Sequence, residues 1–343
     1  MQSRDLQKSD TKHWGAFHLA TEALRDIDRF VRSSAKDLRV LEQAKTKLQG
    51  AVQQDPEFNR ARYYAAVVDD MLGNSTDAVR ELEDLLARNP TFKDEAEYNL
   101  AVSYYHRYYR EHMVEAVRLF QKVIGESPDV VLKYMARAGL VRSFSMMVLH
   151  SIGGSDEPGA AEFFEKVKTE SGALLEELAS DTSVDKRTKQ EITWRVLNGR
   201  GVGFMFASDV QRDPANRRRQ LQEALKDFRE ADDRSPDNWE IVCNLGSVHM
   251  RLGYTHKTQG SEGDAKKEFE RARRYIRDVI DRIRPNYGFA LYEMGRIYRV
   301  EGEFTEALRW FDKAKMIPEK DRNVRDQTIA KQIERATQGD STL

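Results

Sequence analysis

Residues 286–318 read NYGFALYEMGRIYRVEGEFTEALRWFDKAKMIP, and this stretch holds two helical patterns separated by one glycine. The first pattern places apolar or small residues on one helix face, at Leu291, Met294, Gly295 and Tyr298. The second pattern does the same with Ala307, Phe311 and Ala314. Gly302 separates the two patterns, and Pro318, which lacks an N–H donor, ends the second. The stretch therefore predicts two helices joined by a tight turn within about 34 residues.

The second half of this unit recurs along the chain. Each copy has a small residue, a large apolar residue four positions later, an apolar residue three further on, and a proline. Positions i, i+4 and i+7 share one helix face, and a small residue beside a large one allows two helices to pack closely. The other copies are Ala44-Leu48-Ala51-Pro56, Ala78-Leu82-Leu85-Pro90, Ala116-Phe120-Val123-Pro128 and Ala224-Phe228-Ala231-Pro236. We expect these prolines, together with Pro285 and Pro318, to follow helix ends.

The repeated helix pairs resemble the tetratricopeptide-repeat (TPR) family, most clearly at residues 57–128 and 237–318. The resemblance implies an all-α, TPR-type α-solenoid of about seven helix pairs that form a right-handed superhelix. It also implies a concave groove lined mainly by the first helix of each pair.

The pattern predicts a division of the chain into a solenoid and its flanks. We expect regular helix pairs at 37–128 and 237–318 of a solenoid over 12–320, with divergent, oversized pairs at 129–236. The sixth pair is expected to have a long turn over residues 254–264. A polar helix within 321–338 is expected to cap the last repeat, because the last repeat of a solenoid otherwise exposes an apolar face. Residues 1–11 and 339–343 are expected to be disordered.

The composition excludes several classes of function. The net charge of -1 gives no whole-chain argument for nucleic acid or a membrane surface. The single cysteine, Cys243, excludes an intrachain disulfide and a cysteine-rich zinc site. The first residues lack the apolar core of a signal peptide, and the most apolar helical stretch, near 134–152, is too short and too charged to cross a bilayer. We therefore expect a cytoplasmic protein without a membrane segment.

No set of residues predicts catalysis or cofactor binding. The sequence NGRGVG at 198–203 lacks both a preceding strand and the spacing of a phosphate-binding loop. Gly199 and Gly203 share a helix face, so they indicate close helix packing or a helix irregularity. His112 and Glu115 are a lone pair rather than a metal site, and Cys243 and His249 point to different helix faces. We expect no catalytic, cofactor or metal site, and a protein that is not an enzyme.

The helix expected at 265–284 is rich in lysine and arginine. Its cations alternate with Glu268, Glu270, Asp278 and Asp281, whereas a nucleic-acid footprint is less diluted by acids. Nucleic-acid binding through this helix is therefore a remote alternative.

The resemblance places a set of tyrosine and arginine residues in the groove. Tyrosine offers a stiff amphipathic surface, and arginine can bind a carboxylate through two parallel hydrogen bonds. The lysine and asparagine clamp of chaperone-binding TPR proteins is absent, since Tyr63, Val67, Tyr98 and Val102 occupy its positions. The expected groove residues are Arg60, Tyr63, Asp70, Tyr98, Tyr105, His106, Met250, Arg251, Tyr292, Arg296 and Arg299.

The favoured interpretation is a non-enzymatic adaptor or scaffold that binds a peptide or a folded protein in this groove. The partner is expected to offer acidic or C-terminal carboxylate groups to the arginines. An alternative is a regulatory sensor or inhibitory subunit that controls a partner enzyme through the divergent segment 129–236. The sequence leaves self-association open.

Overall fold

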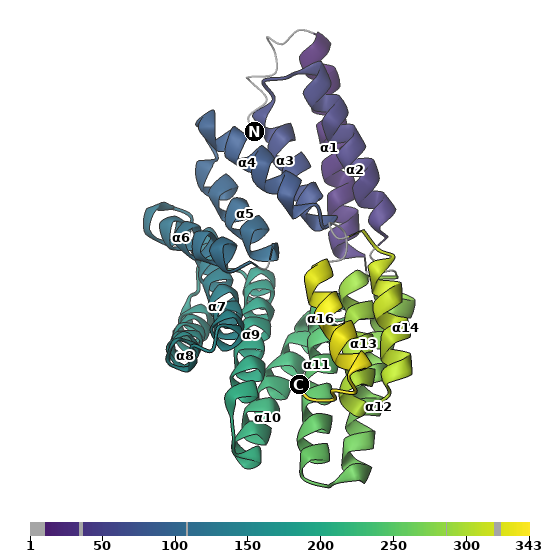
Figure 1. Cartoon of the computed structure of the whole chain (residues 1–343). Helices are drawn as coiled ribbons and strands as arrows, with labels where there is room; N and C mark the ends of the chain where they lie inside the picture. Colours follow the sequence, from purple (N-terminus) through teal and green to yellow (C-terminus); the bar gives the residue numbers. More distant parts are fainter. Residues whose placement is uncertain (1–10, 34–36, 108, 286, 319–323) are drawn as a thin grey trace. The chain divides into compact units, whose positions relative to one another are not determined.

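The computed structural model describes residues 11–33, 37–107, 109–285, 287–318 and 324–343. Within these ranges every regular element is a helix, which confirms the all-α, repeat-type fold (Figure 1). The chain divides into two compact units, Met1–Arg107 and Tyr108–Leu343. Residues 1–10, for which disorder was predicted, lie outside the described residues.

The first unit is a series of helices that each pack on the next one in the chain. Its core consists of small and aliphatic residues, including Ala20, Leu41, Leu48 and Val68, at the spacing that one helix face requires. The helices are α1 (Thr11–Arg32), α2 (Leu38–Gln54), α3 (Asn59–Met71), α4 (Ser75–Ala87) and α5 (Lys93–His106).

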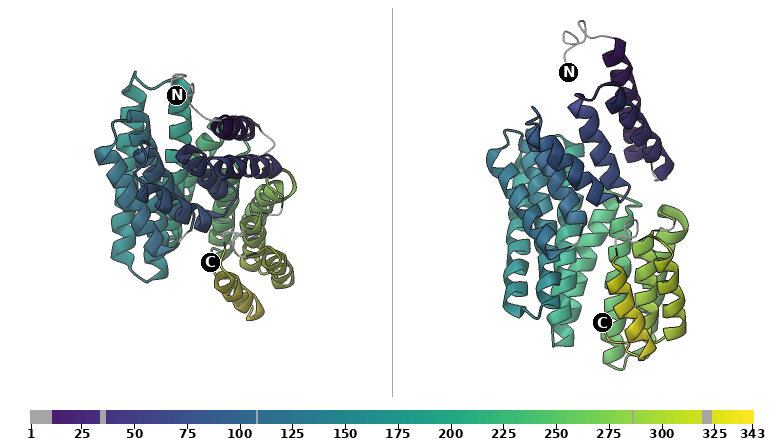
Figure 2. Two further views of the ribbon diagram at one scale, coloured as in Figure 1. Left: turned by 90° about the horizontal axis from the view of Figure 1, so that it is seen from above. Right: turned by 45° about the horizontal axis from the view of Figure 1, so that its top comes forward.

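The second unit contains the longer helices. Helix α7 packs on α6, α8 and α9, and these elements lie close together in both views (Figures 1 and 2). Helix α11 packs on α12, and α13 packs on α14, which in turn contacts α16. The elements are α6 (Arg110–Glu126), α7 (Val130–Gly153), α8 (Glu157–Ser180), α9 (Lys186–Ala207), the 3₁₀ turn η2 (Ser208–Val210), α10 (Pro214–Arg234), α11 (Trp239–Thr258), α12 (Glu262–Asp278), the π turn η3 (Val279–Ile283), α13 (Gly288–Glu301), α14 (Phe304–Lys315) and α16 (Asp326–Thr337).

Short polar side chains and prolines set the helix boundaries. Asp129, Asp185 and Asn238 precede α7, α9 and α11 and accept hydrogen bonds from backbone N–H groups of the first helical turn. The six prolines predicted at helix ends each follow a helix by two or three residues. Gly302 ends α13 with φ 106°, a left-handed conformation that favours glycine.

Glycines on one helix receive phenylalanine rings from another, as the repeat pattern predicted. A Cβ atom at Gly295 of α13 would lie 2.5 Å from Cε1 of Phe311 on α14. A Cβ atom at Gly201 of α9 would lie 2.7 Å from Cε1 of Phe228 on α10. Gly201 belongs to the sequence NGRGVG, which is therefore a helix-packing segment, as expected.

Two local predictions were wrong. The long turn predicted at 254–264 is mostly helical, because α11 continues to Thr258. No glycine or proline occurs between Tyr254 and Gln259, and the first left-handed residue is Gly260, with φ 75°. Residues 339–343, predicted to be disordered, are held in place by hydrogen bonds from Arg299 and Arg335.

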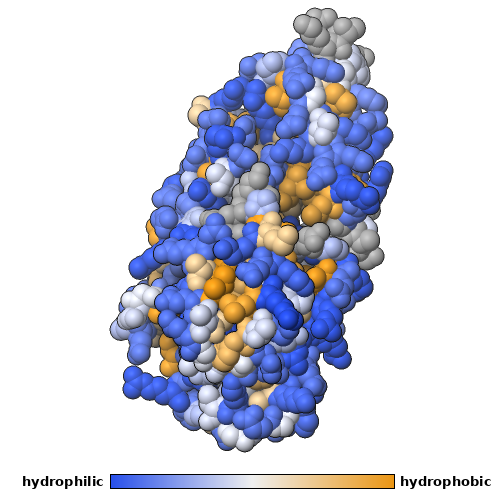
Figure 3. Space-filling view, turned by 45° about the vertical axis from the view of Figure 1, so that its right-hand side comes forward, coloured by the Kyte–Doolittle hydropathy of each residue, from blue (hydrophilic) through white to orange (hydrophobic). Residues whose placement is uncertain are grey.

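The surface agrees with the high content of charged residues. Most of the face drawn in Figure 3 is hydrophilic, and apolar residues gather there only in small patches. Among the described residues, no helix combines the length and the apolar character that crossing a membrane requires.

The thiol of Cys243 is shielded from reagents. Only 1% of the residue is exposed, and burial raises its pKa well above the usual value, so little thiolate forms. We expect a disulfide reagent to label Cys243 at least about a hundredfold more slowly in native protein than in denaturant, because labelling must await local opening. Stopped-flow absorbance of the released thiolate would measure both rates. Prompt labelling in native buffer would contradict this burial.

Candidate interaction surface

The predicted groove residues fall on four helices in two separate units. Helices α3 and α5 of the first unit carry Arg60, Tyr63, Asp70, Tyr98, Tyr105 and His106. Helices α11 and α13 of the second unit carry Met250, Arg251, Tyr292, Arg296 and Arg299. The two sets are therefore described as two surfaces, each within its own unit.

On the first surface, Arg60 and Tyr63 contact α5 and its preceding turn. The guanidinium of Arg60 makes two hydrogen bonds to Glu95, of 2.6 and 3.0 Å, and lies 3.9 Å from the ring centroid of Phe92. The hydroxyl of Tyr63 accepts a hydrogen bond of 2.6 Å from Asn99 Nδ2. These contacts join α3 to α5 and occupy the polar groups that the groove prediction had assigned to a ligand.

A second pair connects the other ends of the same helices. His106 Nδ1 lies 2.8 Å from Asp70 Oδ2. Burial alone would raise the pKa of Asp70, but the neighbouring His106 keeps it below the usual value. Tyr105 is buried, whereas Tyr98 is half-buried. The first surface thus consists mainly of side chains that stabilise the α3–α5 contact.

On the second surface, α11 presents a stripe of polar residues, Glu240, Asn244, Ser247 and Arg251. Their spacings of four, three and four residues place them on one helix face. We call this set the α11 stripe. Each member bonds to a different element: Glu240 to Arg142 of α7, Asn244 to Asn198 of α9, Ser247 to Glu293 of α13, and Arg251 to Asp209 of η2. The stripe is therefore where four elements meet α11.

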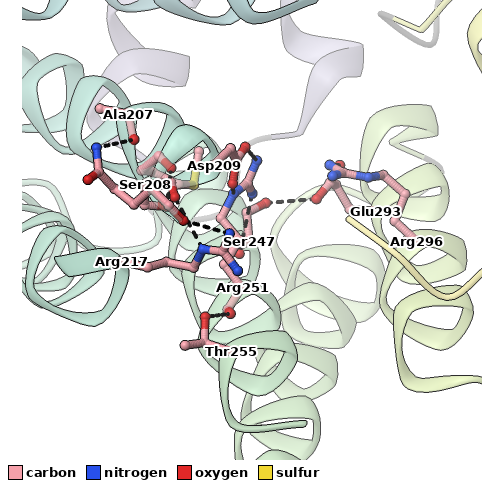
Figure 4. Close-up of polar contacts among 11 residues, drawn as sticks. Ala207, Ser208, Asp209, Arg217, Ser247, Arg251, Thr255, Glu293 and Arg296 are labelled. Carbon is pink, nitrogen blue, oxygen red and sulfur yellow. Dashed lines mark hydrogen bonds and ion pairs between the residues drawn. The ribbon is translucent and has the colours of Figure 1, made fainter. Parts of the chain in front are cut away.

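Arg251 and Asp209 form a two-pronged ion pair (Figure 4). Nε and Nη2 of Arg251 each donate to one carboxylate oxygen of Asp209, and both distances are 2.9 Å. Arg251 is almost fully buried, and its guanidinium also lies 5.6 Å from the ring centroid of Phe206. The pair therefore fixes the 3₁₀ turn η2 against α11.

Glu293 links the α11 stripe to α13. Its carboxylate accepts a hydrogen bond of 2.7 Å from the hydroxyl of Ser247 and one of 2.7 Å from Arg296 Nη1 (Figure 4). Glu293 is only 1% exposed. Burial would lower the pKa of Arg296, but the adjacent Glu293 carboxylate more than offsets this effect and raises it. Arg296 is thus a charged group whose main counterion is Glu293.

Arg299 lies one helical turn beyond Arg296 and is fully buried. Its Nε donates to Gln332 Oε1 at 2.8 Å, and its Nη1 donates to the main-chain oxygens of Asp340 and Thr342, both at 2.7 Å. All three acceptors are uncharged. Burial, together with the nearby Arg335 and Arg296, lowers the pKa of Arg299 to about 10.

Two N–H groups on this surface lack an acceptor among the described residues. They are Nε of Arg296 and Nη2 of Arg299, and both atoms are buried. A buried donor without an acceptor costs about 1–3 kcal/mol, and more when it carries charge. The α13 end of the surface therefore has unused capacity to bind an acceptor.

Other predicted residues belong to the core. Met250 is fully buried with α12 and α13, and Tyr292 is buried against Phe311. The sequence analysis missed Asp209, Glu240, Asn244 and Glu293. The spacing of 240, 244, 247 and 251 could have revealed the stripe, whereas nothing in the local sequence pairs Asp209 with Arg251.

Four cations of the basic stretch predicted to be helical at 265–284 are paired with acids, Lys267 with Asp264 among them. Arg271 contacts Glu268, Arg273 contacts Glu301, and Arg282 contacts both Asp237 and Asp278. Such pairing reduces the positive charge that this stretch can offer to phosphate. Among the described residues, no group of three or more potential metal ligands is present.

The sequence and the structure were compared with those of known proteins. Residues 264–322 match the tetratricopeptide-repeat family, over most of α12 and all of α13 and α14. A TPR protein from Parabacteroides merdae has 13% identity and a TM-score of 0.49, with 94% of this chain and 99% of that chain covered. A thermophilic TPR protein from Thermus thermophilus has 15% identity and a TM-score of 0.43, with 71% and 99% covered. No curated protein sequence matches the chain.

Proposed function

We propose that the chain, whose residues 264–322 match the tetratricopeptide-repeat family, binds a protein partner on the surface formed by α11 and α13. In this role the chain is an adaptor or scaffold, and the proposal assigns no catalytic step to it. The family match covers α13, while the α11 stripe provides the polar residues beside it.

The observation that carries the proposal is the pair of unused donors on α13. Arg296 and Arg299 are held in fixed positions by Glu293 and Gln332, yet each keeps a buried N–H group for which the described residues provide no acceptor. Fixed arginine side chains lose little conformational freedom on binding, which is why they contribute strongly at interfaces. A partner that brings carboxylate or carbonyl oxygens would satisfy these donors.

Binding by purified proteins tests the proposal. The partner would first be identified by affinity capture from the source cells and then titrated calorimetrically against the wild-type chain and Arg296→Gln. We expect the variant to bind at least about tenfold more weakly, which corresponds to about 1.4 kcal/mol. Unchanged affinity of a correctly folded variant would overturn the placement of the site.

Arg309→Gln provides the matched control. Arg309 lies on α14, is largely exposed, and among the described residues pairs with Glu306 one turn away. Exposed ion pairs of this kind contribute little, so we expect its affinity to stay within about twofold of wild type. An equal loss in both variants would indicate a general charge effect and would contradict a specific α13 surface.

A further inference from the structure

The segment Asp340–Leu343 already occupies part of the proposed surface. After α16 the chain turns back to α11 and α13, where Leu343 packs on the cluster that contains Met250 and Met294 (Figure 1). The turn is fixed by Gly339, which has φ 72°, and by a hydrogen bond of 2.8 Å from Asp340 N to Arg335 O. The segment is thus directed onto the surface by the end of α16.

Two arginines bind the backbone of this segment. Arg299 donates to the carbonyl oxygens of Asp340 and Thr342, while Arg335 donates to the main-chain oxygens of Thr342 and Leu343, at 2.8 and 3.1 Å. Main-chain carbonyls are common to every peptide. The contacts of Arg299 therefore recognise a peptide backbone rather than this particular sequence.

Arg335 also makes contacts that depend on the sequence of the segment. Its Nε donates to Asp340 Oδ2 at 2.6 Å, and Asp340 Oδ1 accepts from Thr342 N at 2.8 Å. The carboxylate of Asp340 is therefore engaged by Arg335 and by its own backbone. Arg299 donates a hydrogen bond to the main-chain carbonyl of Asp340 and none to its carboxylate.

Arg299 is consequently a buried cation with incomplete neutralisation. Its hydrogen-bond acceptors are neutral, and its Nη2 has none among the described residues. Arg296 and Arg335 add positive charge nearby, which the carboxylate of Asp340 offsets only in part. A buried charge is costly unless a counterion meets it with good geometry. A carboxylate placed beside Nη1 and Nη2 would provide both charge and two acceptor oxygens.

We propose that residues 340–343 mask the α13 surface as an intramolecular substitute for the partner, and that the partner is a peptide segment with an acidic side chain that displaces them to bind Arg299. This inference rests on the proposed function and specifies its partner and its regulation. A masked site binds with an affinity reduced by the fraction of molecules that are open. Release of the segment is then the step that controls binding.

The test uses peptides supplied in trans. The first probe is the labelled pentapeptide of residues 339–343, acetylated and amidated so that it carries no terminal charge. Four further probes carry glutamate in place of one residue from 340 to 343. Fluorescence anisotropy would measure their binding to the full chain and to a chain ended at Gly339.

We expect the shortened chain to bind the parent peptide at least about tenfold more tightly than the full chain does, because its surface is unmasked. At least one glutamate peptide should bind about tenfold more tightly than the parent, and Arg299→Met should abolish this difference. A folded shortened chain that binds no better than the full chain would overturn the masking. If no glutamate peptide binds more tightly than the parent peptide, the proposal of an acidic partner is overturned.

A second variant covers the case in which the shortened chain does not fold. Arg335→Gln in the full chain removes the guanidinium that makes four hydrogen bonds to the segment but leaves those of Arg299. We expect it to bind the parent peptide several-fold more tightly than wild type, and unchanged binding would contradict the masking. If the natural partner binds the full chain and Arg296→Gln weakens it while these peptide results fail, the proposed function stands without the mask.

Discussion

Phe228→Ala is expected to lower the free energy of unfolding of the second unit by about 3–5 kcal/mol. Phe228 is fully buried in the cluster that joins α9, α10 and α11, with Trp194 and Leu245 among its members. Its ring lies over Gly201, where no side chain is available to fill the space left by the truncation. The cost is thus that of a cavity as well as of lost apolar burial.

Urea denaturation followed by tryptophan fluorescence would measure this effect, since Trp194 lies in the same cluster. Met316→Ala is the control, because Met316 is 82% exposed and its truncation should change stability by less than about 0.5 kcal/mol. Equal losses for the two variants would contradict the central position of Phe228.

The glycine opposite the ring provides a second check on the same contact. Gly201→Ala places a methyl group 2.7 Å from the Phe228 ring, and overpacking of this kind costs about 1–3 kcal/mol. Combining it with Phe228→Leu should cost less than the sum of the single changes, because the smaller side chain makes room for the methyl group. Strict additivity would indicate that the two residues do not press on each other.

Contacts between a glycine and a phenylalanine on adjacent helices also explain why much of the fold could be predicted from the sequence. The pairing of Gly295 with Phe311 depends on one helical period and a short turn, so a pattern within about 34 residues contains all the information. Helix boundaries followed for the same reason, since proline, glycine and the capping aspartates act within a few residues of their own position. The extra helical turn to Thr258 was missed because polar residues there suggested a loop, although none of them breaks a helix.

The candidate surface was harder to predict. Helical spacing shows which residues share a helix face with Arg251 and with Arg299, but it does not reveal what meets that face. The partners are Asp209, which lies 42 residues before Arg251, and the backbone of residues 340 and 342, which lies 41 and 43 residues beyond Arg299. Because these contacts join residues about 40 positions apart, the local sequence did not show that side chains assigned to a ligand also stabilise the unit.

Glu293→Ala is expected to destabilise the second unit by about 3–5 kcal/mol. Glu293 is almost fully buried, and its removal leaves Arg296 without its main counterion and Ser247 without its acceptor. The buried charge of Arg296, left without a counterion, costs far more free energy than the loss of packing by the Glu293 side chain. Urea denaturation of the variant and the wild type would measure the difference.

Replacing both charged partners separates the cost of the orphaned charge from the value of the pair. The double variant Glu293→Leu with Arg296→Met has apolar side chains of similar size, and such replacements are often neutral or stabilising. We expect its stability to return to within about 1 kcal/mol of wild type, while partner binding is lost with Arg296. A double variant as unstable as Glu293→Ala would mean that the pair itself stabilises the unit. Recovered stability with lost binding would mean that Arg296 is maintained at this position for recognition.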